Sequence, residues 1–395
     1  MIRITDKHDC CGCGACARRC PQRCITMNTD AEGFLYPEAD AAACTDCGLC
    51  GRVCPLLNRQ EERAPQASLA VKNRDGVDRA ASSSGGVFIA LARKVVADGG
   101  VVYGAVFDDA WQVMHTSADT AGALRPMMGS KYVQGRIGDT YAEAESNLKK
   151  GRRVMFTGTP CQIAGLRSFL RRDYDNLLLV DILCHGVPSP AVWHRYLEEN
   201  FTGTDASTEI TSVNFRDKRR EGWARYNVVI SGRRCGDKGS ERCLSAAVYT
   251  DNPYMRGLMN DVYLRPSCHK CVCKHGASGS DLTIGDYWGV ARHMPDFDDD
   301  RGVSYVEVYT DKGRRVLDGI DADVRQAVTE GIETGNAGFS TAAPERRYRA
   351  RFFRDLASGL SFDESLDRAL SMPLWRRAVK MLRKGVRRNI KGRTK

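Results

Sequence analysis

The sequence predicts a protein of mixed class (α+β and α/β) in three parts: a small cysteine-rich domain, a mixed α/β body and a basic helical tail. Three observations lead to this prediction. One cysteine pattern occurs twice within the first 55 residues, strand-like and helix-like apolar runs alternate from residue 68, and the sequence turns basic and helical after about residue 340. A length of 395 residues agrees with two or three domains.

The repeated cysteine pattern identifies the first domain, residues 1–58. Both copies read C-x2-C-x2-C-x3-C-P, the spacing of bacterial two-cluster ferredoxins, in which the fourth cysteine of each copy ligates the other cluster. The spacing therefore predicts a ferredoxin-like domain with two [4Fe–4S] clusters. One cluster is assigned to Cys10, Cys13, Cys16 and Cys54, and the other to Cys44, Cys47, Cys50 and Cys20.

Two alternatives explain these cysteines less well. Zinc sites use paired cysteines and do not call for two tandem runs of four that each end in Cys-Pro. A disulfide framework needs an oxidising compartment. Cys11 and Cys24 fall outside the repeated spacing, and we expect them to be bystanders. Gly12, Gly14 and Gly48 suit backbone wrapped closely around a cluster.

The sequence and its composition predict a cytoplasmic protein. The first residues lack the apolar core of a signal peptide, and no apolar run approaches the length of a membrane span. A content of 17 cysteines with iron–sulfur spacing fits a reducing compartment. The formal net charge of +10 equals the ten Lys and Arg residues between Arg376 and Lys395, so the remaining chain is close to neutral.

After a polar segment at 59–67, which contains Pro65 and is predicted to be a linker, the body reads as two α/β stretches, 68–150 and 151–340. Apolar periodicity predicts strands at 68–71, 101–107, 153–156, 177–183, 226–230 and 281–289, with a possible hairpin partner at 111–115. It predicts helices at 85–97, 141–150, 161–170 and 190–201. The last part, 341–395, is predicted to be a basic helical tail.

Four further cysteines in the body stand beside turn residues: Cys161, Cys184, Cys268 and Cys271. The last two form a C-x2-C pair, a spacing typical of metal sites. The spacing alone does not bring the four together, and free cysteines are often small core residues. At this point both interpretations stay open.

Several segments of the body resemble the coenzyme F-420 hydrogenase/dehydrogenase beta-subunit family. They are Ser83–Phe88 (SSGGVF), Lys131–Gln134 (KYVQ), Gly158–Leu166 (GTPCQIAGL), Cys184–Ser189 (CHGVPS) and Ser280–Gly289 (SDLTIGDYWG). The resemblance covers roughly residues 67–310, and the order of the motifs fits as well as their content. Members often carry an N-terminal two-cluster ferredoxin, as this chain does.

The resemblance implies a mixed α/β flavin-binding domain that contains FAD and a [4Fe–4S] cluster of its own. Residues 68–150 and 151–340 would be its two parts, with the third cluster in the second. The family's cluster cysteines match Cys161, Cys184, Cys268 and Cys271. A flavin agrees with the chemistry expected of such a chain, because clusters handle single electrons whereas hydride transfer needs two.

The candidate flavin-binding residues are Ser83, Ser84, Gly85, Gly86, Lys131, Thr157, Gly158, Thr159 and Asp286. The Ser-Gly segment precedes a helix whose N–H groups can bind a pyrophosphate, although simple capping by serine explains it equally well. The turn at 157–160 follows a strand, where open α/β sheets bind ligands. Lys131 is a candidate cation for the flavin or a phosphate. Asp286 is a candidate hydrogen-bond partner for ribityl or ribose hydroxyls. A solvated lysine is the alternative for Lys131.

His185 is the candidate catalytic residue, since a histidine beside Cys184 can deliver a proton at physiological pH. It can equally donate a hydrogen bond to a cluster sulfur. No GxGxxG motif is present, so a nicotinamide cofactor is not supported.

The tail has an apolar stripe on an otherwise basic helix, formed by Trp375, Val379, Leu382, Val386 and Ile390. Such a helix, within residues 372–395, can make peripheral contact with an anionic membrane or an acidic partner. The alternative is an apolar face packed on the body. No nucleic-acid recognition motif is visible. We expect a cytoplasmic protein with a possible peripheral position at the inner face of the membrane.

The leading hypothesis is an iron–sulfur flavoprotein oxidoreductase. It would pass electrons between a redox partner protein or ferredoxin, its clusters and FAD, and exchange hydride with an organic substrate. That substrate is coenzyme F-420 or another acceptor, and the resemblance extends to members in surface-polysaccharide pathways. The main alternative is a non-catalytic electron-transfer subunit that links a partner enzyme to a ferredoxin pool. A cluster-based redox sensor is a third class.

Overall fold

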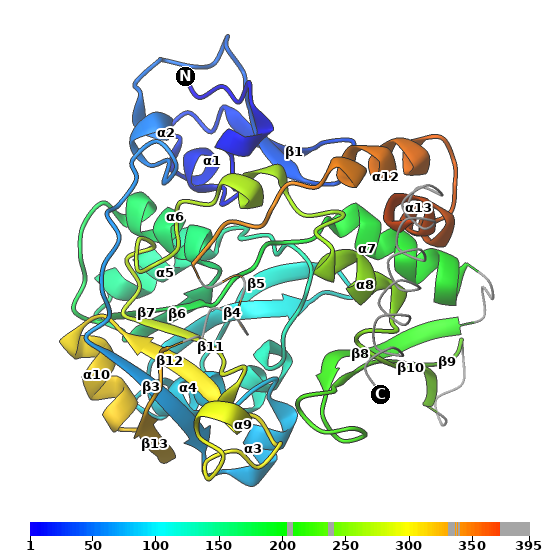
Figure 1. Cartoon of the computed structure of the whole chain (residues 1–395). Helices are drawn as coiled ribbons and strands as arrows, with labels where there is room; N and C mark the ends of the chain where they lie inside the picture. The colour runs from blue at the N-terminus through cyan, green and yellow to red at the C-terminus, as the bar shows by residue number, and fades with distance from the viewer. Residues whose placement is uncertain (204–207, 236–240, 331–335, 337, 339, 372–395) are drawn as a thin grey trace, which may run out of the picture.

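The computed structural model describes the chain except residues 204–207, 236–240, 331–335, 337, 339 and 372–395. It has the predicted mixed α/β class, with a cysteine-rich domain set on a larger body (Figure 1). The basic helix predicted within 372–395, a candidate contact for an anionic membrane or an acidic partner, lies outside the described residues. No helix in the described part of the chain is both long and apolar enough to cross a membrane.

The described elements are as follows. The strands are β1 (Ile25–Thr29), β2 (Leu35–Ala39), β3 (Ala67–Asn73), β4 (Val101–Phe107), β5 (Val113–Ala118), β6 (Val154–Gly158), β7 (Leu177–Ile182), β8 (Thr208–Asp217), β9 (Asn227–Arg234), β10 (Arg242–Val248), β11 (Leu282–Asp286), β12 (Ser304–Val308) and β13 (Ala322–Gln326). The α-helices are α1 (Ala15–Arg19), α2 (Leu49–Arg52), α3 (Gly76–Ala81), α4 (Val87–Ala97), α5 (Thr140–Lys149), α6 (Pro160–Leu170), α7 (Pro190–Leu197), α8 (Pro253–Met259), α9 (Val290–His293), α10 (Asp311–Asp318), α12 (Arg347–Ala357) and α13 (Phe362–Leu370). Shorter helical turns are η1 (Lys7–Asp9), η2 (Gly122–Met127), η3 (Glu198–Thr202) and η4 (Pro266–Lys270).

The body is built on an eight-stranded sheet in the order β13-β3-β12-β11-β7-β6-β4-β5. The four central strands β11, β7, β6 and β4 are parallel, and the strands outside them pair antiparallel. Their alternating residues separate the two faces: Met155 and Leu178 pack with α4, whereas Phe156 and Leu179 pack with α5 and α6. The carboxyl ends of the four parallel strands therefore meet at one edge, where open α/β sheets bind ligands.

Most predicted elements are present, with shifted ends. The predicted strand 153–156 begins one residue later and continues through Thr157 and Gly158, because both residues stay paired with β7. The helix predicted at 190–201 ends at Leu197 and continues as the wider turn η3. The β-rich stretch after 205 forms a separate sheet in the order β10-β9-β8, which shares a core with α7, α8, α12 and α13.

The N-terminal domain has the internal symmetry that its repeated sequence predicts. Gly14 and Gly48 occupy the same place in the two cysteine motifs, and both cap a short helix from the left-handed region, with φ of 72° and 70°. The hairpin β1–β2 covers these helices, and Ile2, Ile25 and several cysteines form a small core of their own.

This domain packs firmly on the body. Cys11 and Cys13 lie in the same core cluster as Ile163 and Leu166 of α6. The turn between β1 and β2 contacts α7 so closely that a Cβ on Gly33 would come within 2.4 Å of the Cβ of Ala191. Beside that turn, Glu32 pairs with Arg349 of α12, with Nη1 to Oε1 at 2.9 Å.

The predicted linker is bound to the body. Arg63 donates its backbone N–H to His275 O (2.8 Å) and its guanidinium to Gly276 O and Ser280 O (3.1 and 2.8 Å). Gln66 N–H donates to Val308 O at 2.7 Å, and β3 begins at the next residue. The segment is therefore anchored through its backbone and Arg63, while most of its polar side chains stay exposed.

Candidate metal centres and cofactor site

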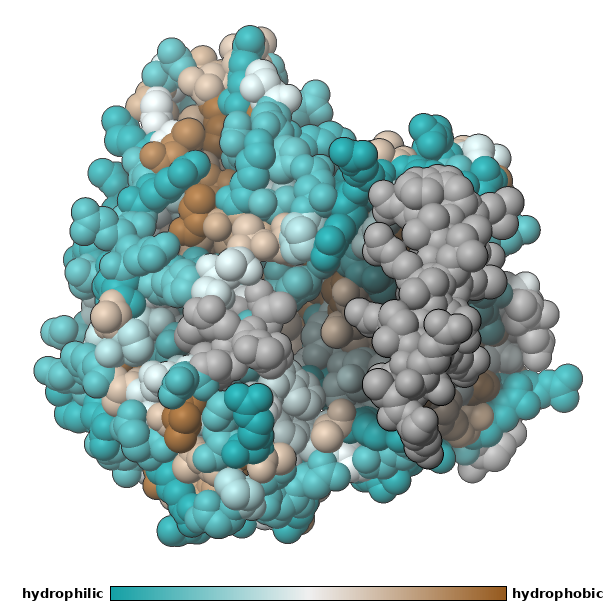
Figure 2. All heavy atoms as spheres, in the orientation of Figure 1, coloured by the Kyte–Doolittle hydropathy of each residue, from teal (hydrophilic) through white to brown (hydrophobic). Residues whose placement is uncertain are grey.

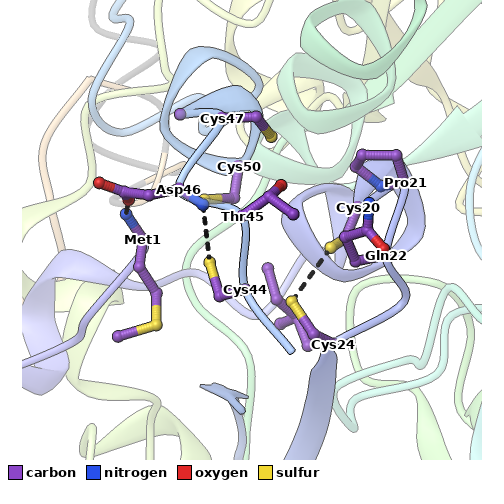
Figure 3. Close-up of a pocket in the computed structure, with 12 residues that line it drawn as sticks. Met1, Cys20, Pro21, Gln22, Cys24, Cys44, Thr45, Asp46, Cys47 and Cys50 are labelled. Carbon is purple, nitrogen blue, oxygen red and sulfur yellow. Dashed lines mark hydrogen bonds and ion pairs between the residues drawn. The ribbon is translucent and has the colours of Figure 1, made fainter. Parts of the chain in front are cut away.

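The first cysteine group, here called the outer group, surrounds a cavity at the surface of the N-terminal domain. Figure 3 shows the sulfurs gathered around this space. The cavity is lined by all four cysteines assigned to one cluster: Cys20, Cys44, Cys47 and Cys50. The backbone N–H of Asp46 donates to Cys44 Sγ at 3.4 Å, as expected for a loop that wraps a cluster. The residues present therefore fit the predicted group.

The outer group is open to solvent. Cys47 is exposed, and Leu57 near the end of this domain is 67% exposed. Figure 2 shows apolar residues at the surface of the domain, in the region of α1 and α2. Cys24, expected to be a bystander, also lines the cavity, with its sulfur 3.4 Å from Cys20 Sγ.

The second group, here called the inner group, consists of Cys10, Cys13, Cys16 and Cys54. Burial raises the pKa of the Cys16 thiol to about 12, and the neighbouring Cys10 and Cys54 act in the same direction. Cys10 is affected by Cys54 in the same way. The structure thus brings the fourth cysteine of the second motif to the first motif, as the spacing predicts. A metal that ionises such buried thiols would remove this penalty, so the inner group also fits a cluster.

The structure also brings together the four cysteines that spacing could not connect, here called the third group. Cys161 lies in the first turn of α6, Cys184 follows β7, and Cys268 and Cys271 flank the end of η4. Burial raises the pKa of Cys184, and Cys268, Cys161 and Cys271 raise it further. Burial likewise raises the pKa of Cys268 to about 12, with added contributions from Cys161 and Cys271. The four thiols therefore lie near one another in the fold, although they come from distant parts of the sequence.

Cys11 connects the inner and third groups. Its thiol lies close enough to Cys13 and Cys161 for the side chains to influence one another: Cys13 raises the pKa of Cys11, and Cys11 raises the pKa of Cys161. In the described residues, no set of three or more His, Cys, Asp and Glu side chains converges on a single-ion position. The assignment of clusters rests on the spacing of the cysteines and on their grouping.

The predicted flavin residues lie at the carboxyl edge of the parallel strands. Thr157 and Gly158 end β6, and Thr159 caps α6 with its hydroxyl 3.3 Å from Cys161 Sγ. His115 Nε2 contacts Thr157 O at 3.0 Å, while His115 Nδ1 is buried without a hydrogen-bond partner. The edge of β6 is therefore shared between the third group and the candidate flavin site.

Lys131 is held close to this edge, partly buried. Its ammonium donates to Met128 O and Gly129 O, both at 3.1 Å, and the structure gives it no carboxylate among the described residues. Burial lowers the pKa of Lys131 to about 7. Burial also lowers the pKa of His115 to about 4, and the charge of Lys131 acts in the same direction. An anionic group bound here would favour the charged form of Lys131.

The Ser-Gly segment is used partly by the protein itself. Ser84 Oγ donates to Val303 O (2.8 Å), and Gly85 N–H donates to Ser304 Oγ (3.0 Å). A Cβ on Gly85 would lie 2.3 Å from Val71 O, so this glycine permits close packing on β3. Gly86, in the left-handed region, is the N-cap residue of α4, and no serine side chain caps this helix. Simple capping by serine is thus wrong, and these contacts leave fewer free donors for a pyrophosphate than the sequence suggests.

Arg216 is a site residue that the sequence analysis missed. It is buried and pairs with Asp286, with Nη1 to Oδ2 at 2.7 Å. It also donates to Tyr132 OH (3.2 Å) and Ser83 O (3.4 Å), and its guanidinium lies 3.9 Å from the Tyr226 ring centroid. Arg216 therefore brings together Ser83, Asp286 and Tyr132, the residue that follows Lys131. Its Nε is buried without a partner, which leaves one donor for a ligand.

His185 lies at the end of β7 with its Nε2 2.5 Å from Oδ1 of buried Asp261. Arg346 contacts the other carboxylate oxygen of Asp261 at 3.3 Å. The ring is thus oriented by a carboxylate, the arrangement that fixes a histidine's tautomer in many sites. The proton-transfer role of His185 stays a prediction.

Comparison with known proteins agrees with the sequence motifs. Residues 151–332 match the family model that describes the C-terminal part of the beta subunit of coenzyme F420 hydrogenase/dehydrogenase. Residues 9–57 match the 4Fe–4S dicluster domain. A chain of the F420-reducing [NiFe] hydrogenase complex from Methanosarcina barkeri is similar in structure, with 14% identity, a TM-score of 0.45, and coverage of 76% of this chain and 97% of that chain. No curated protein matches the sequence significantly.

The two family matches confirm the predicted resemblance over residues 151–332 and the two-cluster iron–sulfur domain at the N-terminus. The repeated cysteine motifs lie within the dicluster match. All four cysteines of the third group lie within the hydrogenase/dehydrogenase match.

Proposed function

We propose that this chain, an iron–sulfur protein related to coenzyme F420 hydrogenase beta subunits, is a flavin-dependent oxidoreductase with three [4Fe–4S] clusters. The observation that carries the proposal is the series of cysteine groups. The outer group is open to a redox partner, the inner group is buried against α6, and the third group shares the edge of β6 with the candidate flavin site. This order suits electron transfer between a ferredoxin or other partner protein and the body.

Each bound group would supply one part of the chemistry: the clusters carry single electrons, and FAD exchanges two electrons as hydride with an organic substrate. The chain's own residues hold these groups in place. The cysteines of the three groups ligate the clusters. Thr157, Gly158 and Thr159 provide a floor at the strand edge, and Lys131 and Arg216 provide positive charge beside it.

Arg216 and Lys131 support a bound anion at this edge for different reasons. Arg216 has its charge matched by Asp286 and offers one unpartnered N–H, so it positions a ligand by hydrogen bonding. Among the described residues, the partners of Lys131 are backbone carbonyls and include no carboxylate. A bound anionic flavin ring or phosphate would therefore supply its missing counter-charge. The substrate would be coenzyme F-420 or another organic hydride acceptor or donor.

Metal and flavin content after strictly anaerobic purification tests the proposal. We expect about twelve iron atoms and about one FAD per chain. The double variant Cys161→Ser/Cys268→Ser should lower iron to about eight atoms and leave the outer and inner clusters intact.

A matched variant tests the flavin site. Lys131→Met should weaken FAD retention with iron content unchanged, because it removes a charge and little volume. A wild-type chain with about eight iron atoms would reject the third cluster. Twelve iron atoms without flavin would instead favour a non-catalytic electron-transfer subunit.

A further inference from the structure

Arg265 is a fully buried cation between the N-terminal domain and the body, with a relative exposure of 0%. Its Nε donates to Cys10 O (2.8 Å), its Nη1 to Gln134 Oε1 (3.0 Å) and its Nη2 to Leu35 O (2.8 Å). The guanidinium also lies 4.3 Å from the ring centroid of Tyr36. All of these partners are neutral.

The other buried arginines differ from Arg265. Arg79 pairs with Asp299, Arg216 with Asp286 and Arg349 with Glu32. Within the described residues, Arg265 has no carboxylate in ion-pair distance. A buried charge without a counter-charge is strongly unfavourable, so an anionic partner is expected at this position.

Arg265 lies between the backbones of cysteines from two different groups. Its Nε bonds the backbone carbonyl of Cys10, a predicted ligand of the inner cluster. Arg265 O accepts the N–H of Cys268 at 2.9 Å, so the cation belongs to the turn that carries two cysteines of the third group.

Gly12 makes room for this guanidinium inside the Cys10–Cys13 loop. A Cβ at Gly12 would come within 2.8 Å of Arg265 Nη1, and the φ of +72° itself favours glycine. The equivalent position in the second motif is Asp46, with a φ of +50°. Its carboxylate pairs with the terminal ammonium of Met1 at 2.5 Å. The two motifs thus place a guanidinium without a carboxylate partner beside one group, and a carboxylate paired with an ammonium beside the other.

We propose that Arg265 is the counter-charge of the inner cluster, shared with the third, and raises the reduction potential of the inner cluster above that of the outer one. The inference rests on the proposed function only in requiring that the cysteine groups hold clusters. A cation close to a cluster stabilises the form that carries the additional electron, and hydrogen bonds to its sulfurs act in the same direction. One electron leaving the reduced outer cluster would therefore move favourably to the oxidised inner cluster, with no proton transferred.

Redox titration of the full-length holoprotein, followed by electron paramagnetic resonance, tests this assignment. The variant Arg265→Gln removes the charge. Gln134→Glu keeps the side-chain shape and places a carboxylate on Nη1 of Arg265. We expect both variants to lower the inner-cluster potential and leave the outer one unchanged. The expected size is at least a tenfold fall in the equilibrium constant for electron transfer from outer to inner cluster, or about 59 mV for one electron.

Two further variants serve as controls. Arg349→Gln removes another contact between the domains that touches no cysteine, so it should leave the inner potential unchanged. Cys47→Ser alters only the outer ligands and identifies which titration step belongs to the outer cluster. Iron content is measured in every variant.

The proposal is overturned if Gln134→Glu retains its iron and leaves the inner potential unchanged, whether or not Arg265→Gln folds. It is also overturned if Arg349→Gln lowers the inner potential equally, because loosened packing would then explain the effect. A wild-type chain with only eight iron atoms would reject the third cluster but would still allow the inner-cluster measurement, so the two failures are distinguishable.

Discussion

The outer and inner cysteine groups have one sequence pattern and opposite surroundings. The outer group includes an exposed cysteine and lines a surface cavity, whereas Cys13 and Cys16 of the inner group are buried. Both loops cap a helix with a left-handed glycine and donate a backbone N–H to the first cysteine at 3.4 Å. The spacing therefore determines the ligand geometry, and the neighbouring residues determine solvent access and charge.

The residues between the ligands show where the two copies diverge. Cys11 and Gly12 in the first motif correspond to Thr45 and Asp46 in the second. Cys11 contacts Cys161 of the third group, and Gly12 admits Arg265. Because the two copies differ at these positions, these two contacts with the body belong to the Cys10–Cys13 loop.

The largest difference between the two groups should follow from removing one ligand from each. Cys13→Ala and Cys47→Ala each delete a predicted ligand, but Cys13 also packs on α6, where a Cβ on Gly165 would lie 2.9 Å from its own. We expect Cys13→Ala to lower the free energy of unfolding by about 2 kcal/mol more than Cys47→Ala, because it leaves a buried space. Chemical denaturation of both variants measures this, and equal losses would show that the inner group does not stabilise the domain contact.

A comparison of similar size should follow from adding one methyl group at each of two glycines of the N-terminal domain. Gly33→Ala would place a Cβ 2.4 Å from that of Ala191 at a φ of +89°, and we expect a loss of about 3 kcal/mol. Gly48→Ala has a similar φ of +70° with nothing within 4 Å of the added Cβ, so its loss should be about 1 kcal/mol. Chemical denaturation of both variants gives the steric contribution as the difference between their losses in free energy of unfolding. Equal losses would mean that the hairpin moves away from Ala191 without cost.

The smallest effect is expected at an exposed contact between η1 and η4. Asp6 accepts the backbone N–H of His8 at 2.9 Å and lies 3.3 Å from Lys270 Nζ. The hydrogen bonds from His8 lower the pKa of Asp6 from 3.8 to about 2. A lowered carboxyl pKa stabilises the fold fully above about pH 4, and this contribution is lost as the pH falls toward 2. Asp6→Asn should therefore lower the melting temperature slightly above about pH 4, and the difference from the wild type should shrink as the pH falls toward 2.

The control for this substitution is Lys270→Met, which removes the cation alone and should have a still smaller effect. A difference between Asp6→Asn and the wild type that did not shrink below about pH 4 would show that the Asp6 carboxylate does not stabilise the fold through its lowered pKa.

Sequence alone identified what depends on local spacing. Both cysteine motifs, the strands at the sheet centre and the helix after Pro160 follow from patterns a few residues long. Local spacing could not predict the third group. Cys161 and Cys184 are brought together because β6 and β7 are neighbours in the sheet, and Cys268 is added by the distant segment η4. Their grouping was expected through family resemblance and not from spacing.

The residues that were missed are mostly charged side chains in the interior. Arg216 and Arg265 carry no local signal, since an isolated arginine in a strand or loop is most often on the surface. Cys11 falls outside the repeated spacing and is therefore expected to be a bystander. In the structure its thiol lies close to Cys161 of the third group. The Ser-Gly segment shows the opposite case, in which a familiar pattern is explained partly by packing on β3.

The anchored segment between the N-terminal domain and β3 has a kinetic consequence. Its backbone and Arg63 are bonded to residues that follow the third cysteine group, and the hairpin turn contacts α7 on another side of the body. A domain held at both places cannot exchange electrons by swinging between distant positions. Intramolecular electron transfer in this protein should therefore proceed at a rate that does not depend on the viscosity of the solvent.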